Sequence, residues 1–166
     1  MSSRRLTHDP SLRLIPATGA DALPDILRVV LAGLPECDAA SIAILREGSP
    51  LNVVASRLTI RWLTELQYRG TAGPCWEATV SNRTVAVPDL AALDAEDDWL
   101  ALARRNGLTA AMAIPVPTAE DTAAVLGVYT RAAPGWTWSV AATATWFAAF
   151  VGHCLAGLKP PAGTAW

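Results

Sequence analysis

A chain of 166 residues is long enough for one domain, because a domain of this size buries roughly 70% of its unfolded surface without help from a metal or disulfide. Thirteen basic residues against fifteen acidic ones give a net charge of −2, with no basic stripe to neutralise phosphates. This balance argues against direct nucleic-acid binding and against strong attraction to a membrane surface. Only 17% of the residues are charged and 52% are hydrophobic, so we expect some apolar surface to meet a partner.

The three cysteines, Cys37, Cys75 and Cys154, are odd in number and widely spaced. This spacing predicts reduced thiols, because it fits neither a disulfide framework nor a metal-binding pair. The first ten residues include basic side chains with no apolar run behind them, which argues against a secretory signal. We therefore expect a cytoplasmic protein.

Hydrophobic periodicity divides the chain into three parts. Residues 1–19 show no sustained period and are predicted to form a flexible N-terminal arm. Residues 20–158 carry the periodic segments and form the globular domain, and residues 159–166 are a tail containing proline and glycine. Asp21 can cap a first helix, whose end is marked by Gly33.

The next segments predict two strands and a helix. Residues 39–46 and 52–56 alternate in polarity around a Gly-Ser-Pro turn, which is typical of a β-hairpin. Residues 59–68 have the longer period of a helix, with Trp62 on its apolar face, and Gly70 then breaks the pattern.

A central stretch follows, G-T-A-G-P-C-W-E-A-T-V-S-N-R-T-V-A-V-P-D-L, at residues 70–90. Pro74 suits the first position of a helix, because the N–H that proline lacks would have no partner there. Cys75 and Trp76 therefore lie in the first turn of this helix. Residues 84–87 are β-branched or apolar and predict a short strand.

The second half of the domain repeats this alternation of helices and strands. Asp98 is placed to cap a helix over residues 99–105, with Asn106-Gly107 as its end. Residues 110–116 and 123–130 alternate and predict a second hairpin. Together, the antiparallel hairpins and segregated helices indicate an α+β fold with a central antiparallel sheet of five to six strands.

Residues 139–158 contain no Asp, Glu, Lys or Arg and are long enough to span a bilayer. They are rich in Ala, Thr and Gly, and the rest of the chain has the pattern of a globular domain. We therefore interpret them as a helix of the domain and predict no membrane span. Large residues on one side can pack on a sheet. The other side carries small residues that permit close helix–helix approach in a homodimer: Ala142, Thr145, Ala149, Gly152 and Ala156.

Two motifs in the central stretch, G-x-x-G-P-C-x-x-A and V-x-V-P-D-L, resemble those of the GAF domain, especially in actinobacterial signalling proteins. The later segments D-D-W-L-A-L-A-R-R-N-G-L-T-A-A-M-A-I-P-V and L-G-V-Y-T-R extend the resemblance to residues 20–158. The resemblance implies a sensory module with its N- and C-terminal helices on one face of the sheet and a helical insert over the other. It also implies an output domain, such as an ANTAR domain, kinase or phosphatase, or a separate signalling partner.

The resemblance places a small-molecule pocket between the sheet and the insert. Four large aromatic side chains there suit a flat, largely apolar ligand. The implied floor is Ile42, Met112 and Ile114, and the implied roof is Trp62, Tyr68, Cys75, Trp76 and Trp99. Simple core packing is the alternative for each of them. The chain lacks an N-K-F-D-E-like signature, which disfavours cyclic nucleotides, and the cofactor stays unknown.

Other functions remain open at this stage. Cys75 at a helix N-terminus can have a lowered pKa, so a thiol-dependent enzyme is one alternative and a metabolite-specific enzyme another. The cysteine spacing does not match the cluster of free methionine sulfoxide reductases, which share the GAF fold. Neither His8 nor His153 lies near the expected pocket, which disfavours haem. A third possibility is a dimerisation module whose cavity is filled by its own tryptophans.

Overall fold

The computed structural model describes residues 22–119, 121–132 and 135–158. The predicted arm at residues 1–19 and the tail at residues 159–166 lie outside this part of the chain. The strands described are β1 (Ala39–Arg46), β2 (Ser49–Ala55), β3 (Val85–Val87), β4 (Ala110–Val116) and β5 (Ala123–Thr130). The helices described are α1 (Leu23–Gly33), α2 (Leu58–Gly70), α3 (Pro74–Ser81), α4 (Asp98–Arg105) and α5 (Trp138–Gly157).

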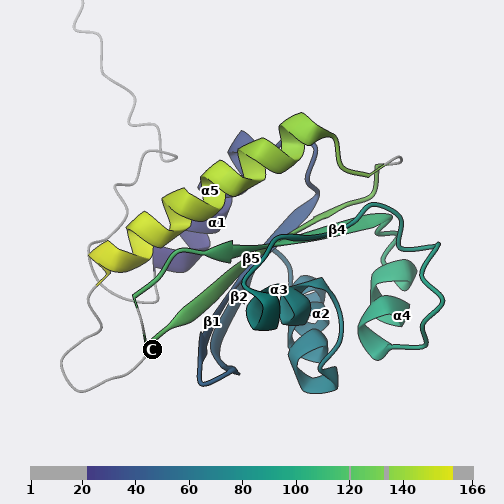
Figure 1. Ribbon diagram of the computed structural model, residues 1–166. Coiled ribbons are helices and arrows are strands. Elements are labelled where there is room, and N and C mark those ends of the chain that lie inside the picture. Colours follow the sequence, from purple (N-terminus) through teal and green to yellow (C-terminus); the bar gives the residue numbers. More distant parts are fainter. Residues whose placement is uncertain (1–21, 120, 133–134, 159–166) are drawn as a thin grey trace, which may run out of the picture.

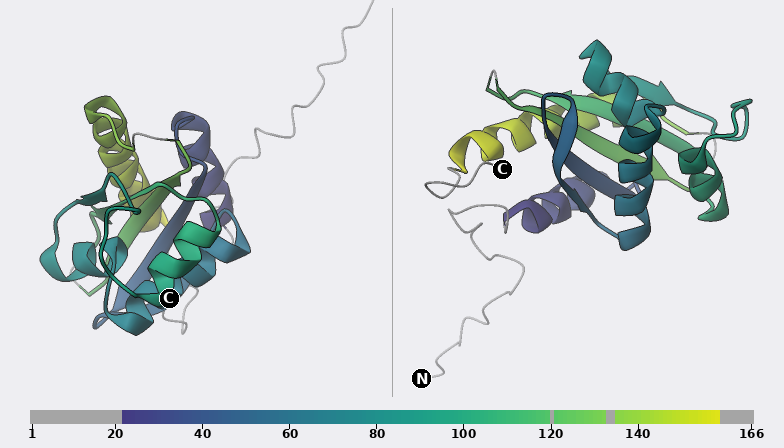
Figure 2. Two further views of the ribbon diagram at one scale, coloured as in Figure 1. Left: turned by 90° about the vertical axis from the view of Figure 1, so that its right-hand side faces the viewer. Right: turned by 90° about the horizontal axis from the view of Figure 1, so that it is seen from below.

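The five strands form one antiparallel sheet in the order β2-β1-β5-β4-β3, which confirms the predicted α+β class. Helices α1 and α5 lie together on one face of the sheet, and α2, α3 and α4 lie on the other (Figures 1 and 2). We call residues 56–109, which carry α2, α3, β3 and α4, the insert. The two sides of the sheet are the terminal-helix face and the insert face.

Separate apolar cores lie on the two faces. On the terminal-helix face, Leu23 and Ile26 of α1 and Val151 of α5 pack with Ile42 of β1 and Leu126 of β5. On the insert face, two smaller clusters join the sheet to the insert. Successive residues of a strand point to opposite faces, so neighbouring residues of one strand belong to different cores.

The first hairpin is tighter than the predicted Gly-Ser-Pro turn. Its two turn residues, Glu47 and Gly48, have φ values of 50° and 78°, and Arg46 pairs with Ser49. A two-residue hairpin loop matches the twist of its strands when both residues have positive φ, which glycine adopts without strain. Strand β2 therefore begins at Ser49, three residues earlier than predicted.

The cap of α4 differs by one residue from the prediction. Asp97 occupies the N-cap position with extended backbone and Asp98 lies in the first turn, and the Asp97 side chain makes no capping hydrogen bond. The predicted stop is present, because Asn106 is the C-cap and Gly107 has a φ of 71°.

Helix α5 is the one helix in the described ranges that is long and apolar enough to cross a membrane by length and composition. It lies along the sheet, with Val140, Ala144, Phe147 and Val151 buried in the terminal-helix core. Its N-terminus is capped by Thr137, whose hydroxyl accepts a hydrogen bond from the Val140 N–H at 3.3 Å.

Candidate functional site

The insert approaches the sheet closely because the insert face is built from small residues at its centre. Ala43, Ala113 and Gly127 lie there on adjacent strands, with Gly127 paired to Ser41 on one side and Ala113 on the other. A Cβ atom on Gly127 would lie 2.8 Å from Ser41 Oγ and 3.1 Å from Cys75 Sγ. The missing side chain makes room for these polar atoms, one of which belongs to the insert.

A cluster of buried polar side chains fills this space, and we call it the polar cluster: Ser41, Thr64, Gln67, Cys75 and Tyr129. The Tyr129 hydroxyl stands at its centre, 3.3 Å from Thr64 Oγ1, 3.3 Å from Gln67 Nε2 and 3.5 Å from Cys75 Sγ. Burial raises the pKa of Tyr129 well above its ordinary value, so the phenol stays protonated.

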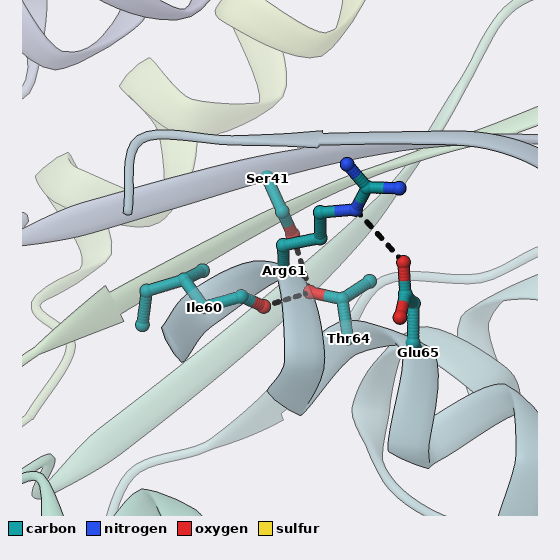
Figure 3. Close-up of polar contacts among 5 residues, drawn as sticks. All are labelled: Ser41, Ile60, Arg61, Thr64 and Glu65. Carbon is teal, nitrogen blue, oxygen red and sulfur yellow. Dashed lines mark hydrogen bonds and ion pairs between the residues drawn. The ribbon is translucent and has the colours of Figure 1, made fainter. Parts of the chain in front are cut away.

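Helix α2 contributes two members of the cluster through residues spaced three apart, which lie on the same side of a helix. Thr64 Oγ1 lies 2.9 Å from Ser41 Oγ on β1 and 2.9 Å from the Ile60 carbonyl oxygen, as Figure 3 shows. The Gln67 side-chain oxygen accepts a hydrogen bond from the Cys75 backbone N–H at 2.8 Å. Gln67 thereby joins α2 to the start of α3.

Other side chains of α2 face outward. Arg61 Nε donates to Glu65 Oε1 at 2.9 Å, and Figure 3 shows this pair beside Thr64. Trp62 is also on the outer side, with half of its surface exposed. The prediction that Trp62 lies on the inner, apolar face of this helix is therefore wrong. The buried positions of α2 are Ile60, Leu63, Thr64, Gln67 and Tyr68. The polarity of Thr64 and Gln67 hides these two from a search for apolar periodicity.

Two of the predicted roof residues meet where α2 and α3 touch. Tyr68 is buried, and its hydroxyl lies 3.1 Å from Thr79 Oγ1 and 3.4 Å from the Cys75 carbonyl oxygen. Cys75 is 1% exposed, and desolvation raises its pKa to about 11. Burial therefore outweighs the helix N-terminus, and the thiol is protonated at neutral pH, contrary to the lowered pKa considered from the sequence.

The remaining aromatic residues of the insert are placed differently from one another. Trp76 is half-buried against the small cluster that contains Cys75. Trp99 is 4% exposed, and its Nε1 has no hydrogen-bond partner among the described residues. A Cβ atom on Gly73, which has a φ of 99°, would lie 2.8 Å from both Trp99 Cε2 and Gln67 Cγ. Trp99 thus closes the polar cluster on the α4 side.

The predicted pocket floor is on the wrong face. Ile42, Met112 and Ile114 are buried in the terminal-helix core with α1 and α5. The insert face of the same strands carries Ala43 and Ala113 instead. Strand alternation identifies two sets of residues but does not say which helices cover each set. The large residues of β1 and β4 fill the space beneath the terminal helices, and the small ones admit the insert.

Four members of the polar cluster were missed by the sequence analysis: Ser41, Thr64, Gln67 and Tyr129. A signal for Ser41 is present, because it is the only hydroxyl residue within the apolar strand β1. The pairing of Thr64 with Gln67 on one side of α2 is visible only after the inner side of that helix is known. Tyr129 fits the alternating pattern of its strand, so nothing in the sequence distinguishes it from the other strand residues.

The described residues hold no group of three metal-ligating side chains. Cys37 and Cys154 contact the terminal-helix core, while Cys75 lies on the insert face. Burial raises the pKa of Cys37 to about 12. The three thiols therefore cannot form one cluster, in agreement with the interpretation of their spacing.

The predicted dimer residues of α5 do not all share one surface. Ala142, Thr145, Ala149 and Ala156 are exposed. Gly152 is buried, and a Cβ atom there would lie 2.4 Å from the Pro117 carbonyl oxygen. Its lack of a side chain lets α5 pack against the loop after β4, so Gly152 is not part of the exposed stripe.

Comparisons with known proteins agree with this architecture. The sequence profile of the GAF domain family matches residues 20–155. Among curated protein sequences, none matches the chain significantly.

Several solved structures have the same fold at low sequence identity. The GAF domain of a phosphoenolpyruvate-protein phosphotransferase from Coxiella burnetii has a TM-score of 0.61 and 14% identity, covering 82% of this chain and 81% of its own. The GAF domain of a two-component sensor histidine kinase from Bacillus halodurans has a TM-score of 0.60 and 12% identity, covering 84% and 95%. A type II free methionine-R-sulfoxide reductase from Thermoplasma acidophilum has a TM-score of 0.56 and 11% identity, covering 84% and 94%.

The sheet order, the helices on its two faces and the profile match over most of the chain lead to one assignment. This chain belongs to the GAF domain family, whose fold is that of a sensory and regulatory domain.

Proposed function

We propose that this chain is the sensory module of a cytoplasmic signalling system, which binds a small, largely apolar or aromatic ligand beneath the insert. The polar cluster is the observation that supports this role. An insert that only covered the sheet would be expected to bury apolar side chains, because buried polar groups cost free energy unless they are well bonded. Here the Tyr129 hydroxyl lies 3.3 Å from Thr64 Oγ1, 3.3 Å from Gln67 Nε2 and 3.5 Å from Cys75 Sγ, all at the long end of the hydrogen-bond range. A ligand offering a shorter hydrogen bond to Tyr129 would be favoured.

The chemistry of the cluster also limits the ligand. Its side chains are hydroxyls, one amide and one thiol, and the Tyr129 phenol and the Cys75 thiol are both held neutral by burial. A phosphate buried among them would have no cation as a partner, at a cost of several kcal/mol. The part of the ligand that reaches Tyr129 is therefore uncharged, which again disfavours cyclic nucleotides.

The signal would leave through α5, paired with α5 of a second copy. This helix contains no Asp, Glu, Lys or Arg, and its outer side exposes Trp146 over 63% of its surface beside Ala142, Thr145 and Ala149. The ring of Trp146 stacks on Phe150, with centroids 6.1 Å apart and planes 5° from parallel. Large exposed apolar surfaces of this kind mark interaction sites. A change in α5 pairing would act on an output domain or a separate partner.

One observation favours a second candidate, a dimerisation module without a ligand. Trp99, Tyr68 and Tyr129 are buried beneath the insert, so the chain's own aromatic side chains fill the space expected for a ligand. In this case the polar cluster would join the insert to the sheet and have no further role.

Native mass spectrometry of protein purified from its own source tests both candidates, because it reports the oligomeric state and any bound molecule together. We expect a dimer carrying one small molecule per chain, which denaturation would release for identification. An empty dimer would support the dimerisation module instead. An empty monomer would contradict both.

A further inference from the structure

Gln67 of α2 caps the start of a different helix, α3. The first N–H groups of a helix have no partner within it, and a side chain at the N-cap position usually accepts one of them. The N-cap residue of α3 is Gly73, which has no side chain to do so. The Cys75 N–H donates instead to the side-chain oxygen of Gln67, Oε1, at 2.8 Å. Gln67 is fully buried, so this oxygen replaces water as the acceptor.

A second buried donor lies beside the same oxygen. The Trp99 side chain is 4% exposed, and its Nε1 has no hydrogen-bond partner among the described residues. Gly73 lets the two side chains meet, because it has no Cβ between them. The point where that Cβ would lie is 2.8 Å from Trp99 Cε2, the atom bonded to Nε1, and 2.9 Å from Gln67 Oε1. Two buried N–H groups, those of Cys75 and Trp99, therefore lie near one carbonyl oxygen.

Only one of these two donors is satisfied in the described conformation. Gln67 Oε1 accepts from Cys75, and the Trp99 N–H is left without an acceptor. A rotation of the Gln67 side chain toward Trp99 would reverse this, leaving the Cys75 N–H unsatisfied. A buried N–H without an acceptor costs roughly tenfold or more in an equilibrium constant. Each arrangement carries this cost once, so an additional acceptor removes it only if Gln67 is free to move.

We infer that Gln67 switches between Cys75 and Trp99, and that the polar cluster binds its ligand through a neutral hydrogen-bond acceptor, such as a carbonyl oxygen or a ring nitrogen. The acceptor of the ligand takes the Cys75 N–H and the Tyr129 hydroxyl, while Gln67 Oε1 moves to the Trp99 N–H. Both buried N–H groups are then satisfied. This inference rests on the proposed function, because it names the group by which the ligand beneath the insert is recognised.

The switch also explains how a small ligand could rearrange the insert. Gln67 Nε2 lies 3.3 Å from the Tyr129 hydroxyl, so the departure of Gln67 frees the centre of the polar cluster. Gln67 belongs to α2, Cys75 to α3 and Trp99 to α4, so one rotation changes contacts among all three helices of the insert. A ligand shifts such an equilibrium only by its differential affinity for the two states. Here that difference is one buried hydrogen bond.

Ligands without a neutral acceptor do not operate the switch. An apolar molecule that displaced Gln67 would leave the Cys75 N–H unsatisfied. A carboxylate or phosphate would supply acceptors, but it would bury a charge among neutral side chains. The acceptor-containing member of a matched pair of probes should therefore bind about tenfold more tightly than the member that lacks the acceptor.

The indole N–H signals of the seven tryptophans provide the test, by two-dimensional ¹⁵N–¹H NMR of the full chain. Trp99→Phe identifies the Trp99 signal by its loss. The probes are acetophenone, which has a carbonyl acceptor, and α-methylstyrene, in which a CH₂ group replaces the carbonyl oxygen. We expect acetophenone to move the Trp99 N–H proton to higher frequency, because that proton gains a hydrogen bond, and to bind about tenfold more tightly than α-methylstyrene.

Gln67→Met removes the acceptor and keeps the length of the side chain. In this variant the Trp99 signal should not move when acetophenone is added, although the backbone N–H signal of Cys75 still does. The matched control is Thr79→Val, which removes a partly buried hydroxyl of the insert outside the polar cluster and should leave the Trp99 response unchanged.

Trp99→Phe tests the switch from the other side, because Gln67 then gains no hydrogen bond on leaving Cys75. Acetophenone should bind this variant about tenfold more weakly, as followed by the Cys75 backbone signal. A Trp99 signal that does not respond to millimolar acetophenone, a response retained in Gln67→Met, or unchanged affinity in Trp99→Phe would each overturn the inference. A bound molecule without a neutral acceptor, found by native mass spectrometry, would refute this inference and leave the proposed function intact.

Discussion

At the scale of single residues, Gly127 controls how closely the insert can approach the sheet. A methyl group there would lie within 3.1 Å of Ser41 Oγ, Tyr129 Oη and Cys75 Sγ. We expect Gly127→Ala to lower the free energy of unfolding by about 1–3 kcal/mol, as overpacked cores do. Urea denaturation measures the change.

Gly157→Ala is the control for this substitution, because no side chain among the described residues, other than those of its chain neighbours, lies within 4 Å of the added methyl group. It should be neutral or slightly stabilising, since alanine is the better helix former. Equal stability of Gly127→Ala and the wild type would show that the polar cluster has room for the added methyl group.

Burial of Cys75 also makes stability depend on pH. The pKa of its thiol is raised from 9.0 to about 11 in the folded chain, so the unfolded state releases this proton first as the pH rises. The stabilisation is complete below pH 9 and is lost between pH 9 and 11. Urea denaturation at pH 8, 9 and 10 should show a falling free energy of unfolding.

Cys75→Ala should make this pH dependence shallower without abolishing it, because burial also raises the pKa of Cys37 to about 12. Cys154→Ala is the control, since Cys154 is only partly buried and its removal should change the slope less. An unchanged slope in Cys75→Ala would mean that this thiol ionises in the folded chain as it does in the unfolded one.

At the scale of elements, α4 is fastened to the loop before it by one arginine. Arg104 Nη2 donates to the Leu90 carbonyl oxygen at 2.9 Å and to the Leu93 carbonyl oxygen at 2.6 Å. Arg104→Met should cost about 1 kcal/mol and speed amide hydrogen exchange over residues 90–100. Arg105→Met, one residue further along the exposed side of α4, should leave exchange unchanged. Equal exchange in both variants would show that other contacts hold the loop.

The sequence predicted the helices and strands better than it predicted which of them pack together. Hydrophobic period, together with capping residues and the proline at position 74, located the helices and strands described. The prediction that Ile42 and Met112 lie on the insert face was wrong. Both sides of β1 and β4 are buried, so alternation cannot tell which side faces the insert. Thr64 and Gln67 were missed for a related reason: an inward-facing polar residue has the same period as an outward-facing one. The site therefore depends on tertiary contacts that no single segment encodes.

At the scale of the whole molecule, the exposed side of α5 is the proposed dimer surface. Trp146→Glu would place a charge at its centre and should convert a dimer into a monomer. Analytical ultracentrifugation measures the oligomeric state. Trp62→Glu is the control, because Trp62 is also about half exposed but lies on the insert side, and it should remain dimeric. A dimer that survives Trp146→Glu would mean that another surface joins the two copies.

The separation of the two cores determines how binding on the insert face could change the structure on the terminal-helix face. Ser41 points into the insert core, and its neighbour Ile42 points into the core beneath α1 and α5. The buried clusters on the two faces are distinct, with the sheet between them. A ligand under the insert would therefore reach α5 by displacing or twisting β1 and β5 as whole strands. The backbone hydrogen bonds between these two central strands would then report the signal before any side chain of the terminal helices moves.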